Sequence, residues 1–170
     1  MTVARTVGHA LLAGAIAIGI NIFLLNLADR FGVVTARGGL QRLVKFWLAG
    51  PVTQSGIGGF WVAVGLPGPN TAIFKTGFKV AVGLGMALFY AVALEPRITG
   101  SALSKGLAYA VLVWLLNALI VLPLLGEGPA GSRVLTPLGM IFFALAHTAF
   151  FVVLALVYEA LRSGPSGIAR

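Results

Sequence analysis

Cysteine is absent from the 170-residue chain. Its absence excludes disulfide bonds, iron–sulfur clusters held by this chain, thiolate zinc sites and thiolate-bridged copper centres. The absence of cysteine does not indicate a reducing or an oxidising compartment, because such a chain is compatible with either side of a membrane.

Charge is also scarce. Only 9% of the residues are charged, whereas a soluble domain of this size has roughly 25%, and 59% are hydrophobic. Such a chain needs lipid as part of its solvent. Twelve basic residues stand against four acidic ones, which are Asp29, Glu95, Glu127 and Glu159. The bases are scattered between apolar runs without interleaved aromatic residues, which excludes nucleic acid as a partner and favours anionic lipid head groups.

Four apolar stretches have about the 20 residues that crossing a membrane requires. They cover about 7–28, 72–94, 102–124 and 137–161. The sequence therefore predicts an all-α membrane protein with four transmembrane helices in a single membrane domain, residues 1–170. The first stretch is longer than the core of a signal peptide, so we expect a retained first helix. An even number of helices puts both termini on one side.

The connection between the first two helices is unusually long. Within it, the segment at about 38–62 begins with apolar residues on one helical face and with Arg42 and Lys45 on the other. This pattern predicts a short basic amphipathic helix in the head-group plane. We expect Trp47 to be its interfacial anchor, with Arg42 and Lys45 facing lipid head groups.

Small residues recur at every fourth position in two of the predicted helices. The stripes are Gly77, Ala81 and Gly85 in the second helix, and Ala102, Gly106 and Ala110 in the third. Small residues let helix backbones approach closely in lipid. We expect both stripes to pack the bundle, with a homodimer face as the alternative.

The chain also contains a candidate internal repeat. Residues 73–90 and 141–158 are identical at six of eighteen aligned positions, and both blocks end in Ala-Leu-x-Tyr. The first helix aligns with the third at a different offset, which places Asn21 on Asn117. This pattern predicts two hairpins in parallel pseudo-repeat, with the interfacial segment inserted into the first.

Four polar residues fall at a similar depth in the predicted helices. With a rise of about 1.5 Å per residue, Asn21, Lys79, Asn117 and His147 lie about 10–15 Å below the surface opposite the termini. Polar residues inside a membrane face inward and pair, so the layer predicts a site for a polar head group, such as that of a quinone, or for a proton. In the alternative, the amides and His147 bond the helices together while Lys79 reaches to the interface.

Catalytic and metal-binding patterns are missing from the sequence. No hydroxyl residue has a histidine and an acid at matching depth, so we expect neither an enzyme nor a metal site. His9 and His147 differ in height by about 15–20 Å, so the chain cannot ligate a haem from both sides by itself. We therefore expect no cofactor held by this chain alone, with a quinone or a lipid as the candidate ligand.

The third helix reads Gly-Leu-x-Tyr-x-Val-Leu-Val-Trp-Leu-Leu-Asn over Gly106–Asn117, and Leu122–Gly126 follows as Leu-Pro-Leu-Leu-Gly. With His147 and Tyr158 in the fourth helix, residues 72–162 resemble a family of small four-helix integral membrane proteins of bacteria and archaea whose function is unknown. The resemblance implies the fold and a prokaryotic cell (inner) membrane. The family's second helix has a histidine where this chain has Lys79, which argues against a paired-histidine role.

These patterns predict an accessory, non-catalytic subunit of a larger respiratory or other redox membrane complex. Its partners would be other integral membrane subunits and membrane lipids. The alternatives are a small homo-oligomeric transporter or channel whose path the polar layer lines, and a quinone- or lipid-binding membrane protein. The density of bases on the terminus side favours termini in the cytoplasm.

Overall fold

The computed structural model describes residues 2–35, 40–42 and 71–164. Four helices of this part of the chain are long and apolar enough to cross a membrane, which confirms the all-α, four-helix prediction. The helical segments are α1 (Val3–Arg30), α5 (Ala72–Phe89) with π-helical η1 (Tyr90–Leu94), α6 (Ala102–Leu116) with π-helical η2 (Asn117–Val121) and α7 (Leu122–Leu124), the 3-10 turn η3 (Pro129–Gly131), and α8 (Pro137–Ser163). The first helix extends beyond the predicted 7–28 at both ends.

Three of the helices begin at a capping hydroxyl residue. The side-chain oxygens of Thr71, Ser101 and Thr136 accept the backbone N–H three residues later, at 3.2, 3.3 and 3.1 Å. These bonds satisfy donors that the first turn of a helix leaves without a partner. Pro137 follows Thr136 at the first helical position, where its missing N–H has no cost.

Both π-helical segments end two residues before a proline. A proline has no N–H to donate, and its ring crowds the preceding turn. The backbone widens in each case: after η1, Glu95 N–H bonds to Tyr90 O at 2.8 Å, five residues back, before Pro96. The second widening begins at Asn117 and ends before Pro123. Such widened turns are rare and frequently lie at functional sites.

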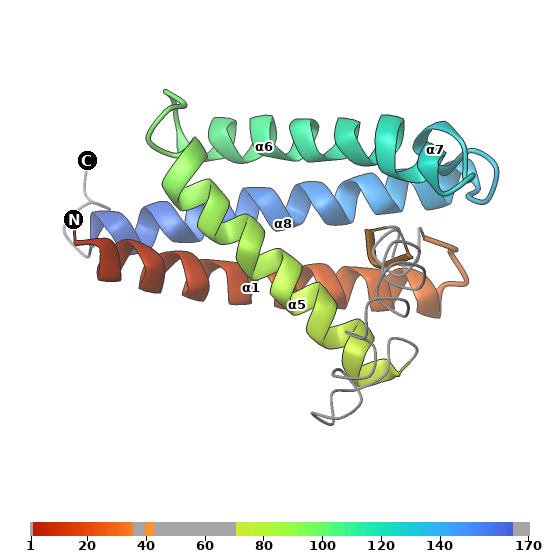
Figure 1. Ribbon diagram of the computed structural model, residues 1–170, viewed down its shortest axis with the longest axis horizontal. Helices are drawn as coiled ribbons and strands as arrows, with labels where there is room; N and C mark the ends of the chain where they lie inside the picture. Colours follow the sequence, from red (N-terminus) through yellow and green to blue (C-terminus); the bar gives the residue numbers. More distant parts are fainter. Residues whose placement is uncertain (1, 36–39, 43–70, 165–170) are drawn as a thin grey trace, which may run out of the picture.

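The bundle has α1 and α8 at its centre. In Figure 1, α1, α8 and α6 run nearly side by side, and α1 packs against both α8 and α5 while α8 packs against α6. The start of α1 and the end of α8 lie together, and we call this the terminus end of the bundle (Figure 1). The opposite end, where α5 and α8 begin, is the far end.

Helix α5 crosses the bundle obliquely, close to α6 at the terminus end and well apart from it at the far end (Figure 1). Near the terminus end, Tyr109 of α6 donates to Met86 O of α5 at 3.3 Å and its ring lies 6.0 Å from that of Tyr90. The two hairpins are present. In a parallel pseudo-repeat α1 would be equivalent to α6 and α5 to α8, so α6 would pack along α5 in the way that α1 packs along α8. The described helices depart from that symmetry because α5 diverges.

One of the two predicted small-residue stripes does not pack the described helices together. Gly77, Ala81 and Gly85 are exposed, and an added Cβ on either glycine would meet nothing within 4 Å. The opposite side of α5 packs instead: an added Cβ on Gly83 would lie 2.6 Å from Ile18 of α1. Small residues four positions apart occur on both faces of α5, as Gly77, Ala81 and Gly85 on one and Gly83 and Ala87 on the other. Only the crossing angle decides which face is buried.

The stripe of α6 lies against α8. A Cβ added to Gly106 would lie 2.9 Å from Phe151 O and Val152 Cα, so the two backbones approach closely here. Ala110 is buried and Ala102 is half-buried.

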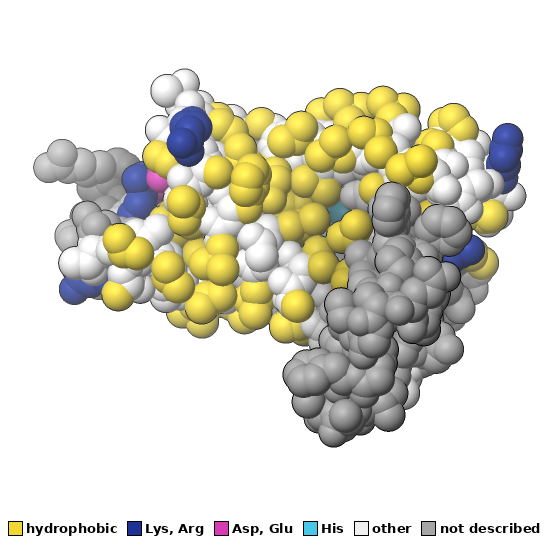
Figure 2. All heavy atoms as spheres, in the orientation of Figure 1, with side chains coloured by type: hydrophobic (Ala, Val, Ile, Leu, Met, Phe, Trp, Pro, Cys, Tyr) yellow, Lys and Arg dark blue, Asp and Glu magenta, His cyan; other side chains and the backbone are white. Residues whose placement is uncertain are grey.

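Apolar side chains cover the middle of the molecule, and lysine and arginine side chains gather at its two ends (Figure 2). Large hydrophobic residues are exposed along every long helix, for example Phe23, Leu119 and Ile141. In water this surface would be unstable, but in a bilayer it faces hydrocarbon.

Candidate functional site

A cavity of about 520 Å³ lies in the far half of the bundle, where α5 has parted from α6. We call it the far cavity. Side chains of α1, α5 and α8 form most of its wall, with Asn117 and Leu122 on one side and Thr35 and residues 40–42 at the far end. In Figure 2 a histidine side chain is visible in a hollow among the apolar side chains of this face.

All four residues of the predicted polar layer line the far cavity: Asn21 from α1, Lys79 from α5, Asn117 from η2 and His147 from α8. Asn21 Nδ2 donates to the backbone oxygen of Ala146 at 2.8 Å and so links α1 to α8. The far cavity therefore collects, from four helices, polar groups that are distant along the chain.

Asn117 and His147 are oriented by bonds within their own helices. Asn117 Nδ2 donates to Val113 O at 3.1 Å, and His147 Nδ1 lies 2.9 Å from Phe143 O. Both bonds reach back four residues. Of the three residues that could bond helices together, only Asn21 forms an interhelical bond. Asn117 and His147 bond within their own helices.

Lys79 projects from the exposed side of α5, one turn after Lys75, and both side chains line the far cavity. Within the described part of the chain, neither ammonium group has a hydrogen bond or an ion pair. No described carboxylate therefore pairs directly with either ammonium group, although Asp29 lines the same cavity.

The far cavity is bordered at the far end by residues 40–42, which are helical. Arg42 forms an ion pair with Glu127, whose carboxylate is buried in the connection between α7 and α8. This pair ties the first connection to the last one. The other predicted interfacial residues, Lys45 and Trp47, lie outside the described residues.

The two histidines are far apart along the bundle. His147 follows Ala146, which is level with Asn21, and His9 lies twelve residues before Asn21 on the same helix. At about 1.5 Å per residue, the separation along α1 is about 18 Å. This height difference is incompatible with one haem between both rings. Among the described residues, no three His, Asp or Glu side chains gather as a metal site would require.

A second charged site, which the sequence analysis missed, lies at the terminus end. Glu95 is buried and pairs with two bases: Lys105 Nζ at 3.1 Å and Arg162 at 3.0 Å. Arg162 also pairs with Glu159 at 2.9 Å. We call these four residues the terminus-end cluster. The sequence does hold a signal for the first of these pairs, because Glu95 and Lys105 flank the turn between two consecutive helices.

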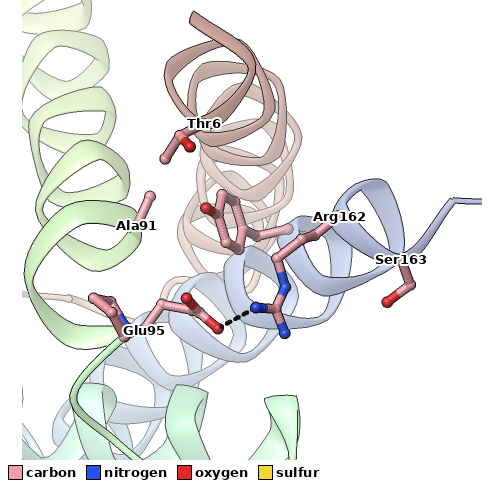
Figure 3. Close-up of a pocket in the computed structure, with 7 residues that line it drawn as sticks. Thr6, Ala91, Glu95, Arg162 and Ser163 are labelled. Carbon is pink, nitrogen blue, oxygen red and sulfur yellow. Dashed lines mark ion pairs between the residues drawn. The ribbon is translucent and has the colours of Figure 1, made fainter. Parts of the chain in front are cut away.

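Figure 3 shows Glu95 and Arg162 pointing toward each other across a shallow cavity of about 500 Å³. Thr6 of α1 and Ser163 of α8 also line this cavity. The cluster joins the end of the second helical span, the start of α6 and the end of α8. The cluster has two acids and two bases, so its net charge is zero. This balance suits ion pairs that hold the helices together rather than a site for a charged ligand.

The fold and the far cavity together define a class: a multi-pass α-helical membrane protein with a cavity inside the bundle that is lined by both polar and apolar side chains. No protein-family model, no curated protein and no solved structure matches the chain. The resemblance noted from residues 72–162 stays a prediction.

Proposed function

We propose that this protein binds an amphiphilic membrane molecule, such as a lipid, in the far cavity. The observation that carries the proposal is the gradient of polarity along the cavity. Its volume of about 520 Å³ is in the range of small-molecule sites, roughly 300–1,000 Å³.

The gradient follows the helix axes from the far end inward. Asp29, Arg42 and Lys75 line the part nearest the far end, and the layer of Asn21, Lys79, Asn117 and His147 follows at one similar depth. The innermost part is lined by Ile18, Val82 and Phe150. A lipid in the adjoining leaflet has the same order of groups, with its head at the interface and its hydrocarbon toward the membrane centre.

A pair of matched variants tests this proposal. Val82→Trp fills the apolar part of the far cavity, whereas Val92→Trp places the same side chain on an exposed position of η1, where Val92 is 62% exposed. Native mass spectrometry after mild detergent extraction measures bound lipid per protein. We expect Val82→Trp to lose the bound lipid and Val92→Trp to keep it. Equal lipid content in both variants would contradict the proposal.

A second candidate, a subunit of a larger membrane complex, is favoured by the exposed small-residue face of α5. Gly77, Ala81 and Gly85 form a face on which another helix fits closely. The prediction of an accessory, non-catalytic subunit of a redox complex takes its support from this face. Extraction in mild detergent, native electrophoresis and mass spectrometry test it: recovery of this chain alone, unchanged by Gly85→Leu, would exclude a partner at this face.

We propose a prokaryotic inner membrane as the location, with the termini in the cytoplasm. The support is the density of bases in short segments of the terminus end, such as Arg5 and Arg97. The far cavity would then adjoin the leaflet that faces away from the cytoplasm.

A further inference from the structure

The tautomer of His147 decides what this residue offers a ligand. Its Nδ1 lies 2.9 Å from Phe143 O, and a backbone carbonyl oxygen can only accept. Nδ1 therefore carries the hydrogen, and in the neutral ring Nε2 presents a lone pair. No described residue bonds Nε2. Since His147 lines the far cavity, this acceptor is available to a group that donates, such as a hydroxyl.

The same reasoning orients the two amides. Asn21 and Asn117 each place Nδ2 against a backbone oxygen, so each amide oxygen lies on the other branch of its side chain. Each amide retains one N–H and one oxygen for a ligand. The middle layer of the far cavity is thus richer in acceptors than in donors, which suits a ligand that brings hydroxyl groups.

The charge of the far cavity points to an anion. Lys75 and Lys79 line it without a described carboxylate partner. The chain has four acids, and three of them are engaged elsewhere: Glu95 and Glu159 in the terminus-end cluster, and Glu127 with Arg42. The fourth, Asp29, also lines the far cavity and has an interaction of its own. A cation beside an apolar cavity is costly unless it is paired. With Arg42 paired to Glu127, two lysines stand against this one carboxylate, and the excess positive charge favours an anionic ligand.

We infer that the far cavity selects a lipid whose head group carries both a phosphate and a free hydroxyl. The phosphate pairs with Lys79, the hydroxyl donates to His147 Nε2, and the hydrocarbon lies along Ile18, Val82 and Phe150. This inference rests on the proposed function and names its ligand class. A quinone fits less well, because it has no negative charge to pair with Lys79 and no hydrogen to donate to His147 Nε2.

Three lipids with the same acyl chains separate the two contacts. Phosphatidylglycerol has the phosphate and the hydroxyl, phosphatidylmethanol has the phosphate alone, and diacylglycerol has a hydroxyl alone. We expect the full-length, delipidated protein in detergent to bind phosphatidylglycerol about tenfold more tightly than either of the other two, the effect of one polar contact. Titrations followed by native mass spectrometry measure these affinities.

Two variants assign the contacts to residues. Lys79→Gln is expected to abolish the preference over diacylglycerol and keep the preference over phosphatidylmethanol. His147→Asn is expected to do the reverse. Asparagine at this position retains the bond to Phe143 O, as Asn117 bonds to Val113 O, but removes the Nε2 acceptor. Arg30→Gln, at an exposed base of the far end outside the cavity lining, is the control and should change neither preference.

The outcomes separate the inference from the proposed function. If all three lipids bind wild type equally well, or if Arg30→Gln acts like Lys79→Gln, the inference is wrong while lipid binding stands. If glycerol 1-phosphate, which has no acyl chains, binds as tightly as phosphatidylglycerol, a soluble phosphate is the ligand and the lipid assignment is overturned. If none of the lipids binds, the proposed function fails and the inference fails with it.

Discussion

At the scale of single residues, the ion pairs of the few acids determine which basic side chains have a counter-charge within the chain. Glu95 is the most heavily engaged, because its carboxylate bridges Lys105 and Arg162. Its side chain is 10% exposed, as is that of Lys105. A carboxylate buried in this way matters less for the energy of its pair than for the charge that its removal leaves unbalanced.

We predict that Glu95→Gln destabilises the protein by about 3–5 kcal/mol, because it leaves the buried ammonium of Lys105 without a counter-charge. Reversible unfolding in mixed micelles measures the change. The double variant Glu95→Gln with Lys105→Met should recover much of the loss, since it removes both buried charges.

Glu159→Gln is the matched control within the same cluster. Glu159 is 35% exposed and pairs with Arg162 three residues away on α8. Water screens such a pair, so the expected loss is about 0.5 kcal/mol or less. If Glu159→Gln destabilised the protein as much as Glu95→Gln, the central role of Glu95 in the cluster would be wrong.

At the scale of helices, close packing depends on which face of each helix carries the small residues that meet a neighbour. Gly106 lets α6 approach the backbone of α8, and Gly83 lets α5 approach Ile18 of α1. Gly85 is on the other face of α5 and meets nothing within 4 Å. Two glycines that are two residues apart on one helix therefore have opposite roles.

We predict that Gly106→Ala destabilises the bundle by about 1–3 kcal/mol, the usual cost of overpacking, because its Cβ would lie 2.9 Å from the α8 backbone. Gly85→Ala should be neutral or stabilising by up to about 1 kcal/mol, because alanine favours the helix and nothing in the described structure obstructs it. Thermal unfolding of the two purified variants compares them. Equal destabilisation by both substitutions would mean that the face assignment of α5 or of α6 is incorrect.

At the scale of the whole molecule, charged side chains occupy the two ends and apolar side chains the middle (Figure 2). The turn that contains Thr99 belongs to the terminus end, and the connection that contains Ser132 belongs to the far end. Both residues are exposed, and the chain has no cysteine of its own, so single cysteines report on each end separately.

We predict that an impermeant maleimide added to intact cells labels Ser132→Cys and not Thr99→Cys, and that Thr99→Cys becomes reactive after the cells are opened. The reason is that the two ends of a spanning bundle face different compartments. The reverse pattern would invert the proposed orientation. Labelling of both cysteines in intact cells would argue against a bundle that spans the membrane.

Much of the architecture follows from the sequence because lipid imposes strong constraints on it. A span must satisfy its backbone hydrogen bonds internally and must be about 20 residues long, so hydropathy alone predicts 72–94 and 102–124, the observed bounds of two spans. The common depth of Asn21, Lys79, Asn117 and His147 follows from the helical rise in the same way. The depth of a residue in a spanning helix depends only on its position along the chain, so it can be predicted from the sequence.

Rotation about the helix axis and the crossing angle between helices are not properties of one segment. They depend on how side chains of different helices fit, so the packing face of α5 at Gly83 and the Glu95–Lys105–Arg162 network emerged only in the tertiary structure. The sequence by itself determined four spans and the height of each polar group. Only the tertiary structure decided that α5 leaves α6 at the far end, because close packing of α1 against Gly83 and Ala87 tilts α5 and opens the cavity on which both proposals rest.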